Sequence, residues 1–410
     1  MTRVAATPPG IRSAPFRLLL VASVLGVGGY AMLLPVVPLW AAHGGSGTFG
    51  AGASTGVFML VTVLTQVAVP WLLPRVGHRW VQGAGLVLLG APAPAFVLSD
   101  GLVPLLTLCA ARGVGFGMVT VVGAALVAEL TPPAEHGRAS ALQGMAVGLP
   151  QLALLPIGVG IVDRFGFGPA FVAGASPVLA ALLVPFIRVR AAASPSPGPG
   201  RRPAGGRAVR ASSSGPGSRG ALGPVLAMVS CAVAQGGLIT FLPLSVGGSS
   251  AVVPVALFGT AAGTLVGRLV AGELVDRRGL GGRLLCPGVL IALFGMLAEV
   301  LTAGAAPTGV GSAVLVAGGA TMVGVGFGLV QNDSLVALFA AAGPARYGSA
   351  SALWNITYDA GTGVGAVGLG AVAEPFGFRA AFAVAALVLA LVLPTTLRRR
   401  SGRRGGPKAV

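Results

Sequence analysis

The sequence predicts an all-α membrane protein with twelve transmembrane helices in two pseudo-symmetric six-helix bundles. Three observations predict this fold. The 410-residue chain is 54% hydrophobic and only 9% charged, whereas soluble domains contain about 25% charged residues. Its apolar residues form twelve runs long enough to cross a bilayer. The second half of the chain also repeats blocks of the first.

Six of the apolar runs lie in the first half. The first run is flanked by arginines and is too long for the core of a cleaved signal peptide, so it predicts an uncleaved spanning helix. Polar and turn residues set the other boundaries. The expected helices cover residues 16–42, 50–73, 81–98, 103–128, 139–162 and 169–187.

A basic segment follows the sixth run. Between Arg188 and Ala221 it contains seven arginines among Pro, Gly, Ser and Ala, and it has no acidic residue. Such a composition buries too little apolar surface to fold, so the segment predicts a solvated, disordered linker. The expected divisions are a tail (1–15), a first bundle (16–187), the linker (188–222), a second bundle (223–397) and a basic tail (398–410).

The second bundle contains the other six runs. Its expected helices cover residues 225–244, 252–274, 284–303, 313–341, 350–372 and 380–397. An even number of spans places both termini and the linker on one side of the membrane. The charges then decide which side this is.

Basic residues concentrate on that side. Of the 27 Lys and Arg residues, 23 fall in the tails, the linker and the loops on the same side. The positive-inside rule therefore places both termini in the cytoplasm, with the chain in the cell membrane. The net charge of +17 is then a topology signal, and we expect no nucleic-acid partner.

The repeat is visible at an offset of 211 residues. Gly113-Val-Gly-Phe-Gly-Met-Val119 aligns with Gly324-Val-Gly-Phe-Gly-Leu-Val330. Two further blocks, beginning at Gly137 and Asp163, align at the same offset. Two parallel repeats of six helices are typical of transporters whose halves rock about a site between them.

Several motifs resemble those of the major facilitator superfamily. The clearest is Gly272-Glu-Leu-Val-Asp276-Arg277-Arg278-Gly279, which is similar to the family's G-x-L-x-D-R-x-G loop. Arg112 before a glycine run resembles the family's intramembrane arginine motif. Gly144, Gly148 and Pro150 resemble the Gly-Pro motif of its exporters, and helices ten and eleven resemble bacterial arabinose-efflux permeases and drug:proton antiporters.

The resemblance has two departures. The other copy of the loop motif keeps Arg75 and Gly77 but has Pro74 where the family has an aspartate. The first helix contains no carboxylate, because the first acid in the chain is Asp100. A proton-carrying acid would therefore have to lie elsewhere.

Ionisable side chains at membrane depth are functional candidates. Arg112 and Asp359 each lie about nine or ten residues inside a helix, or roughly 15 Å deep. Arg112 is expected to hold an anionic group or to influence a carboxylate, with a buried pair or carbonyl clamp as the alternative. Asp359 is expected to carry a proton, with a structural hydrogen bond as the alternative.

Other polar residues of helices ten and eleven complete the expected substrate and proton pathway. By resemblance, helix ten lines the cavity, and for Asp333 a substrate contact and a solvated wall remain open. The further members of the pathway are Gln331, Asn332, Asn355 and Tyr358.

The charged loops predict a gate. Asp276 is expected to hold the cytoplasmic side shut by contacting the start of helix five and pairing with Arg138, with a purely topological turn as the alternative. Helix five is expected to provide packing or hinge positions. The gating residues are Gly272, Asp276, Arg277, Arg278, Gly279, Arg75 and Gly77, and the packing or hinge residues are Gly144, Gly148 and Pro150.

The sequence therefore predicts a secondary transporter of a small organic molecule, exporting it in exchange for protons. The alternatives are an uptake permease for a sugar or organic anion and, remotely, a membrane enzyme. The three cysteines lack metal-site spacing and no nucleotide-binding loop occurs, so we expect no metal and no cofactor. The expected partners are the substrate, membrane lipid and protons, with the chain acting as a monomer.

Overall fold

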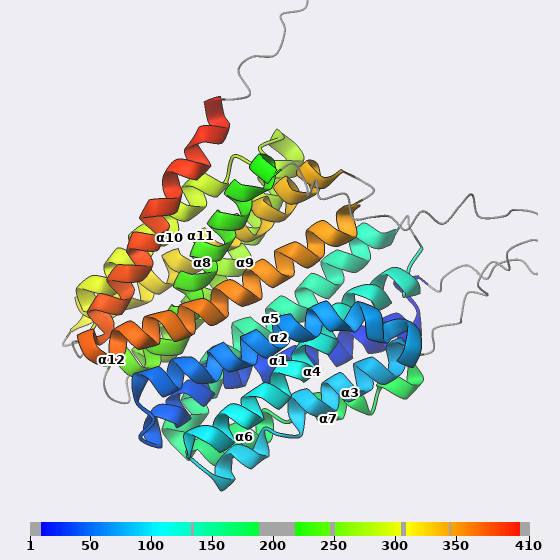
Figure 1. Ribbon diagram of the computed structural model, residues 1–410, viewed down its shortest axis with the longest axis horizontal. Coiled ribbons are helices and arrows are strands. Elements are labelled where there is room, and N and C mark those ends of the chain that lie inside the picture. Colours follow the sequence, from blue (N-terminus) through cyan, green and yellow to red (C-terminus); the bar gives the residue numbers. More distant parts are fainter. Residues whose placement is uncertain are drawn as a thin grey trace, which may run out of the picture.

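The computed structural model describes residues 10–132, 135–187, 218–246, 251–304, 309–343 and 346–401. Every regular element within these ranges is a helix. Figure 1 shows two groups of long helices, one built from residues before the basic segment and one from residues after it. The expected all-helical architecture is confirmed.

The first bundle contains the six expected spans, two of which are interrupted. The third span breaks after Gly90, where Pro92 and Pro94 lack the backbone N–H that a continuing helix needs. The sixth breaks at Gly174. The elements are α1 (Ala14–His43), α2 (Gly47–Val76), α3 (His78–Gly90), η1 (Pro94–Leu98), α4 (Leu102–Leu130), α5 (His136–Phe165), α6 (Phe167–Ala173), α7 (Ser176–Ala181) and η3 (Val184–Phe186).

The second bundle ends in a helix that crosses the membrane twice. Its elements are α8 (Ser218–Ser245), α9 (Val252–Arg278), α10 (Leu285–Thr302), α11 (Val310–Ala342) and α12 (Tyr347–Ser401). With 55 residues, α12 is far longer than the roughly 20 residues that span a bilayer. Its backbone turns at Gly377, where φ is +79°, and Figure 1 shows the orange and red parts running in different directions.

Eleven helices of the described residues are long and apolar enough to cross a membrane. The last of them, Gly348–Leu397, is 50 residues long and contains two of the expected spans. Counting it twice accounts for the twelve predicted crossings. We call the end of the bundles where α1 begins, α8 begins and α12 ends the linker end, and the opposite end the far end.

The repeated glycines allow equivalent helix contacts in the two bundles. A Cβ atom at Gly113 of α4 would lie 2.4 Å from the carbonyl oxygen of Phe58 in α2. At the repeat position, a Cβ at Gly324 of α11 would lie 2.1 Å from the carbonyl oxygen of Thr260 in α9. Only glycine permits such close approach, which is the usual role of small residues between membrane helices.

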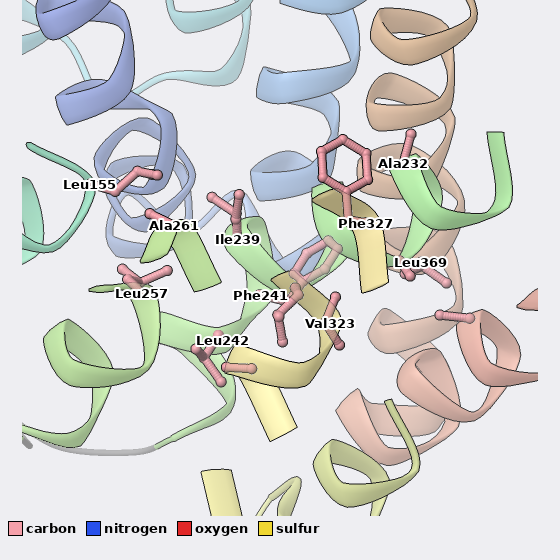
Figure 2. Packing of buried hydrophobic residues seen from close by; sticks show 14 of the residues in the cluster. Leu155, Ala232, Ile239, Phe241, Leu242, Leu257, Ala261, Val323, Phe327 and Leu369 are labelled. Carbon is pink, nitrogen blue, oxygen red and sulfur yellow. The ribbon is translucent and has the colours of Figure 1, made fainter. Parts of the chain in front are cut away.

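The hydrophobic core is continuous across the two bundles. Figure 2 shows Leu155 of α5 near Leu257 and Ala261 of α9, with Phe241 and Phe327 farther into the second bundle. These side chains belong to one cluster of buried residues that includes both halves of the chain. The bundles therefore touch through apolar packing at mid-depth.

The expected domain boundaries differ from the helix ends by a few residues. Helix α8 begins at Ser218, inside the segment expected to be linker, and α12 continues to Ser401, past the expected end of the second bundle. At the other end α1 begins at Ala14, where the Ser13 hydroxyl accepts a hydrogen bond from the Phe16 N–H at 3.3 Å. The expected disorder of 188–217 lies outside the described residues.

Candidate functional site

A cavity of about 390 Å³ lies between the bundles, within the size range of pockets that hold small molecules. Its wall includes residues of α1, α4 and α5 from the first bundle and of α8, α9, α11 and α12 from the second. It extends from mid-depth, at Tyr30 and Phe327, toward the linker end, at Ser23 and Ser140. Apolar side chains form much of the wall, and polar groups from both bundles enter it.

Asp359 reaches this cavity from α12, as the sequence predicted. Its side chain is only 3% exposed, and its Oδ2 accepts a hydrogen bond of 2.7 Å from the Nε2 of Gln66 in α2. The same Nε2 lies 3.2 Å from the hydroxyl of Thr120 in α4. The carboxyl group of the second bundle is thus held by an amide of the first, directly at the interface between the bundles.

Three other expected pathway residues line the cavity. Gln331, Asn355 and Tyr358 all contribute to its wall. Asn332 does not, because its Nδ2 turns toward the backbone oxygen of Arg268 at 3.5 Å. The assignment of Asn332 to the pathway is therefore not supported by the geometry, since adjacent helical residues point in different directions.

Arg112 lies outside the main cavity, contrary to expectation. It is 3% exposed and borders a separate space of about 20 Å³. Its Nε donates to the carbonyl oxygen of Leu89 at 3.0 Å, and its guanidinium lies 5.7 and 5.8 Å from the rings of Phe58 and Phe96. Tyr30 borders both spaces and so separates Arg112 from the cavity that contains Asp359.

Asp333 is also misplaced by the sequence analysis. Its side chain is 0% exposed and does not line the cavity. Its oxygens accept backbone N–H hydrogen bonds from Gly282 at 2.6 Å, Leu284 at 2.8 Å and Leu285 at 3.0 Å. The carboxylate therefore caps the N-terminus of α10, where unsatisfied N–H groups favour negative charge.

The expected inner latch is not formed in this structure. Asp276 and Arg138 are both exposed, and neither of the two salt bridges found among the described residues joins the bundles. Arg277 instead pairs with Glu273, one turn earlier in α9, at 3.3 Å. The linker end therefore has no Asp276–Arg138 contact within the described chain, in agreement with a cavity that extends toward this end.

The other residues of the two loop motifs serve local geometry. Gly279 has φ of +62° and ends α9, while Gly77 has φ of +87° between α2 and α3. Arg75 stacks on Trp71 at 3.8 Å and donates to its carbonyl oxygen. Arg278 is exposed, and the nearest atom to a Cβ at Gly272 would be the Nδ2 of Asn332 at 3.5 Å.

Two glycines of α5, Gly144 and Gly148, are not used for close packing, unlike Gly158, where a Cβ would lie 2.4 Å from the carbonyl oxygen of Met32. A Cβ at Gly144 would meet nothing within 4 Å, and one at Gly148 would only just reach Leu265 at 3.9 Å. Both glycines line the cavity. Pro150 lies in the same helix and packs near Gly28 of α1. Close packing at Gly144 and Gly148 is therefore absent, and their small size widens the cavity. The alternative hinge role of these residues stays a prediction.

The sequence analysis missed Arg268, a second charged group on the cavity wall. Its depth is the signal that identifies it. Arg268 lies ten residues before the end of α9 at Arg278, or roughly 15 Å inside the helix end, too deep to belong to the charged turn. Other missed lining residues share a polar side chain on an inward helix face: Tyr30, Gln143, Gln151 and Gln235.

The far end is closed by a contact between α12 and α2. Oε2 of Glu374 accepts hydrogen bonds from the backbone N–H of Thr48 at 2.7 Å and of Phe49 at 3.0 Å, and from the Thr48 hydroxyl. Gly47, with φ of +65°, allows this approach, because a Cβ there would lie 2.6 Å from the carboxylate. The bundles are thus joined at the far end, whereas the cavity wall continues toward the linker end as far as the exposed Ser140.

Comparison with known proteins identifies a family of membrane proteins. Residues 19–366 match the sequence profile of the Major Facilitator Superfamily. No curated protein sequence matches the chain.

Solved structures match it over nearly its whole length. A bacterial homologue of the human lysosomal transporter Spinster, in an inward-facing and occupied conformation, has a TM-score of 0.72 at 16% identity, covering 97% of this chain and 100% of its own. A mutant of the nucleoside transporter NupG has 0.72 at 11%, covering 94% and 99%. A mutant of the peptide transporter POT has 0.73 at 16%, covering 97% and 98%.

Proposed function

Because the chain belongs to the major facilitator superfamily, and is therefore a secondary transporter of small molecules rather than an enzyme, we propose that it couples transport to protons through Asp359. The observation that carries this proposal is the position of that carboxyl group. It reaches the cavity between the bundles and bonds to Gln66 of the opposite bundle. A change in its charge would alter both the cavity and the interface.

The proposed orientation follows from the basic residues. The positive-inside rule places the linker end in the cytoplasm, so this structure is an inward-open state with its outer end closed by Glu374 and Thr48. Alternating access then requires the Glu374 contact to break as the inner end closes. The exposed Asp276 and Arg138 are proposed to meet in that other state.

The proposed direction is export in exchange for protons. It is supported by the resemblance of helix five to exporters, where Gly144 and Gly148 both face the cavity. In this scheme the substrate and the proton alternate on the inward-open cavity, and Asp359 releases its proton before the substrate binds.

A second candidate is uptake of an organic anion together with protons. It is favoured by one observation, the presence of Arg268 on the cavity wall. A cation that faces the substrate path and has no salt bridge within the described residues suits an anionic substrate.

Transport into proteoliposomes under imposed pH gradients tests these proposals. The substrates are a panel of radiolabelled small organic acids, amines and uncharged compounds. We expect a pH gradient to accelerate transport of at least one class. An acidic lumen accelerates uptake in proton exchange, whereas an acidic exterior accelerates it in co-transport.

The variant Asp359→Asn should abolish the effect of the gradient while leaving some gradient-independent exchange. Asp163→Asn is the matched control, because Asp163 is exposed at the end of α5 and does not line the cavity. Gradient dependence that survives in Asp359→Asn would refute the assignment of the proton to this residue.

A further inference from the structure

The cavity contains one basic and one acidic side chain among its lining residues, Arg268 and Asp359. No salt bridge joins them within the described residues. Asp359 already accepts its hydrogen bond from Gln66, whereas no salt bridge or side-chain hydrogen bond engages the Arg268 guanidinium in the described part of the chain. Asp359 therefore has a hydrogen-bond partner in the protein, whereas the Arg268 guanidinium is available to bind a ligand.

An arginine at this depth is costly to keep. Its backbone lies roughly 15 Å inside the end of α9, and an ionisable side chain at such a depth is a functional candidate. Arg268 is half-buried on the cavity wall, so its charge has lost part of its hydration, and an anion that pairs with it there gains more than it would in bulk water. A transporter can supply the missing partner from its substrate.

We propose that Arg268 is the anion-binding subsite of the cavity and that the substrate is a small monoanionic carboxylate with an apolar body. The guanidinium is planar and matches a carboxylate with two parallel hydrogen bonds. One cation balances one negative charge, which favours a monoanion over a doubly charged phosphate. This inference rests on the second candidate function, uptake of an organic anion together with protons, and names the chemistry of its substrate.

The remaining wall fits such a molecule. The carboxamide oxygens of Gln235 and Gln331 line the same cavity and are buried with no partner among the described residues, so they can accept from an O–H or N–H group on the substrate's body but not from its carboxylate. Farther along, Phe116 and Phe327 offer aromatic surface for the apolar body. The volume of about 390 Å³ limits the substrate to a small molecule.

The position of Asp359 couples this subsite to protons. An anion on Arg268 repels a charged Asp359 in the same cavity, so protonation of Asp359 and anion binding should strengthen one another equally. The other ionisable groups facing Asp359 are Tyr30 of α1 and Tyr358 of α12, while Gln66, Thr120, Gln235 and Gln331 are the neutral polar groups on the elements around it. Proton and anion are then carried together, which favours the uptake candidate.

The test compares charged and neutral versions of the same probes. Binding of 4-phenylbutyrate, benzoate and hexanoate to the purified full-length protein is measured by calorimetry beside binding of their amides. We expect at least one acid to bind about tenfold more tightly than its amide, the worth of one charge-assisted contact, with tighter binding at lower pH. Equal binding of acids and amides, or no binding of any acid, overturns the proposal.

Variants locate the effect. Arg268→Gln should remove the preference for the acid, and Arg268→Lys should keep part of it. The control Arg17→Gln removes one positive charge from an exposed site on α1 outside the cavity and should leave the preference unchanged. An unaltered preference in Arg268→Gln overturns the assignment. The comparison of acid and amide in the natural protein stands even if that variant does not fold.

Asp359→Asn separates this inference from the proposed function. If the carboxylate preference remains in Asp359→Asn but its pH dependence disappears, both proposals hold. If the preference depends on Arg268 while pH dependence persists in Asp359→Asn, the anion subsite holds and the proton assignment fails.

Discussion

Replacement of Asp333 distinguishes a structural cap from a residue of the substrate pathway. The side chain is fully buried and accepts three backbone N–H hydrogen bonds at the start of α10. Asp333→Ala removes every one of these acceptors. Each buried donor left without a partner costs about 1–3 kcal/mol, and water entering from the neighbouring turn will recover part of the loss.

We therefore expect Asp333→Ala to lower the free energy of unfolding by about 3–5 kcal/mol. Asp333→Asn keeps one oxygen and removes the charge, so its loss should be smaller, at about 1–2 kcal/mol. Asn332→Ala is the matched control. Among the described residues, its only side-chain hydrogen bond is the long 3.5 Å contact to the backbone oxygen of Arg268, and its removal should change stability by less than about 1 kcal/mol.

Thermal unfolding of the purified protein measures these changes. The three cysteines of the chain are free and buried, so a thiol-reactive fluorogenic dye reports their exposure as the protein unfolds. Asp333→Asn with unchanged unfolding but a lost response of transport to the pH gradient would refute the capping argument. It would return Asp333 to the substrate pathway.

Three further substitutions test other parts of the structure. Glu374→Gln should weaken the closure of the far end, because it removes the charge that caps α2 at Thr48. A cysteine introduced at the buried Ser54 should then react faster with a membrane-impermeant thiol reagent. An unchanged rate would count against a closing role of the Glu374 contact. Gly324→Ala should destabilise the protein by about 1–3 kcal/mol, because its Cβ would lie 2.1 Å from a backbone oxygen. Gly318→Ala is the control: its Cβ would have no atom within 4 Å, so the same unfolding assay should show little change. Arg112→Met removes a buried cation that has one hydrogen bond among the described residues, so thermal stability should stay the same or rise. The response of transport to the pH gradient should persist. Loss of that response in a folded variant would return Arg112 to the transport pathway.

The sequence predicted the helices well because their signal is local. Runs of apolar residues must hide their backbone polar groups in a bilayer, and helices satisfy those groups within each run. The glycine repeat was equally informative, since Gly113 and Gly324 meet neighbouring helices in the same way. The sequence also predicted two separate spans, 350–372 and 380–397, which lie on either side of the turn at Gly377 within α12.

The candidate site was predicted only in part because a side chain's direction is not a local property. Asp359 and Arg112 are both ionisable and lie at similar depths in the sequence, yet one lines the cavity and the other lies behind Tyr30. The sequence placed Asp333 in the cavity, but in the structure its carboxylate accepts hydrogen bonds from three backbone N–H groups at the start of α10.

The sequence alone determined that the chain spans a membrane in two repeated halves, because hydropathy and repetition are written residue by residue. Only the tertiary structure decided which charges line the cavity between the bundles. Arg268, which the sequence analysis did not single out, lines it, and Asp333 does not. The physical reason is rotation: a helix carries each residue 100° around its axis, and packing against its neighbours fixes which of these directions opens onto the space between the bundles.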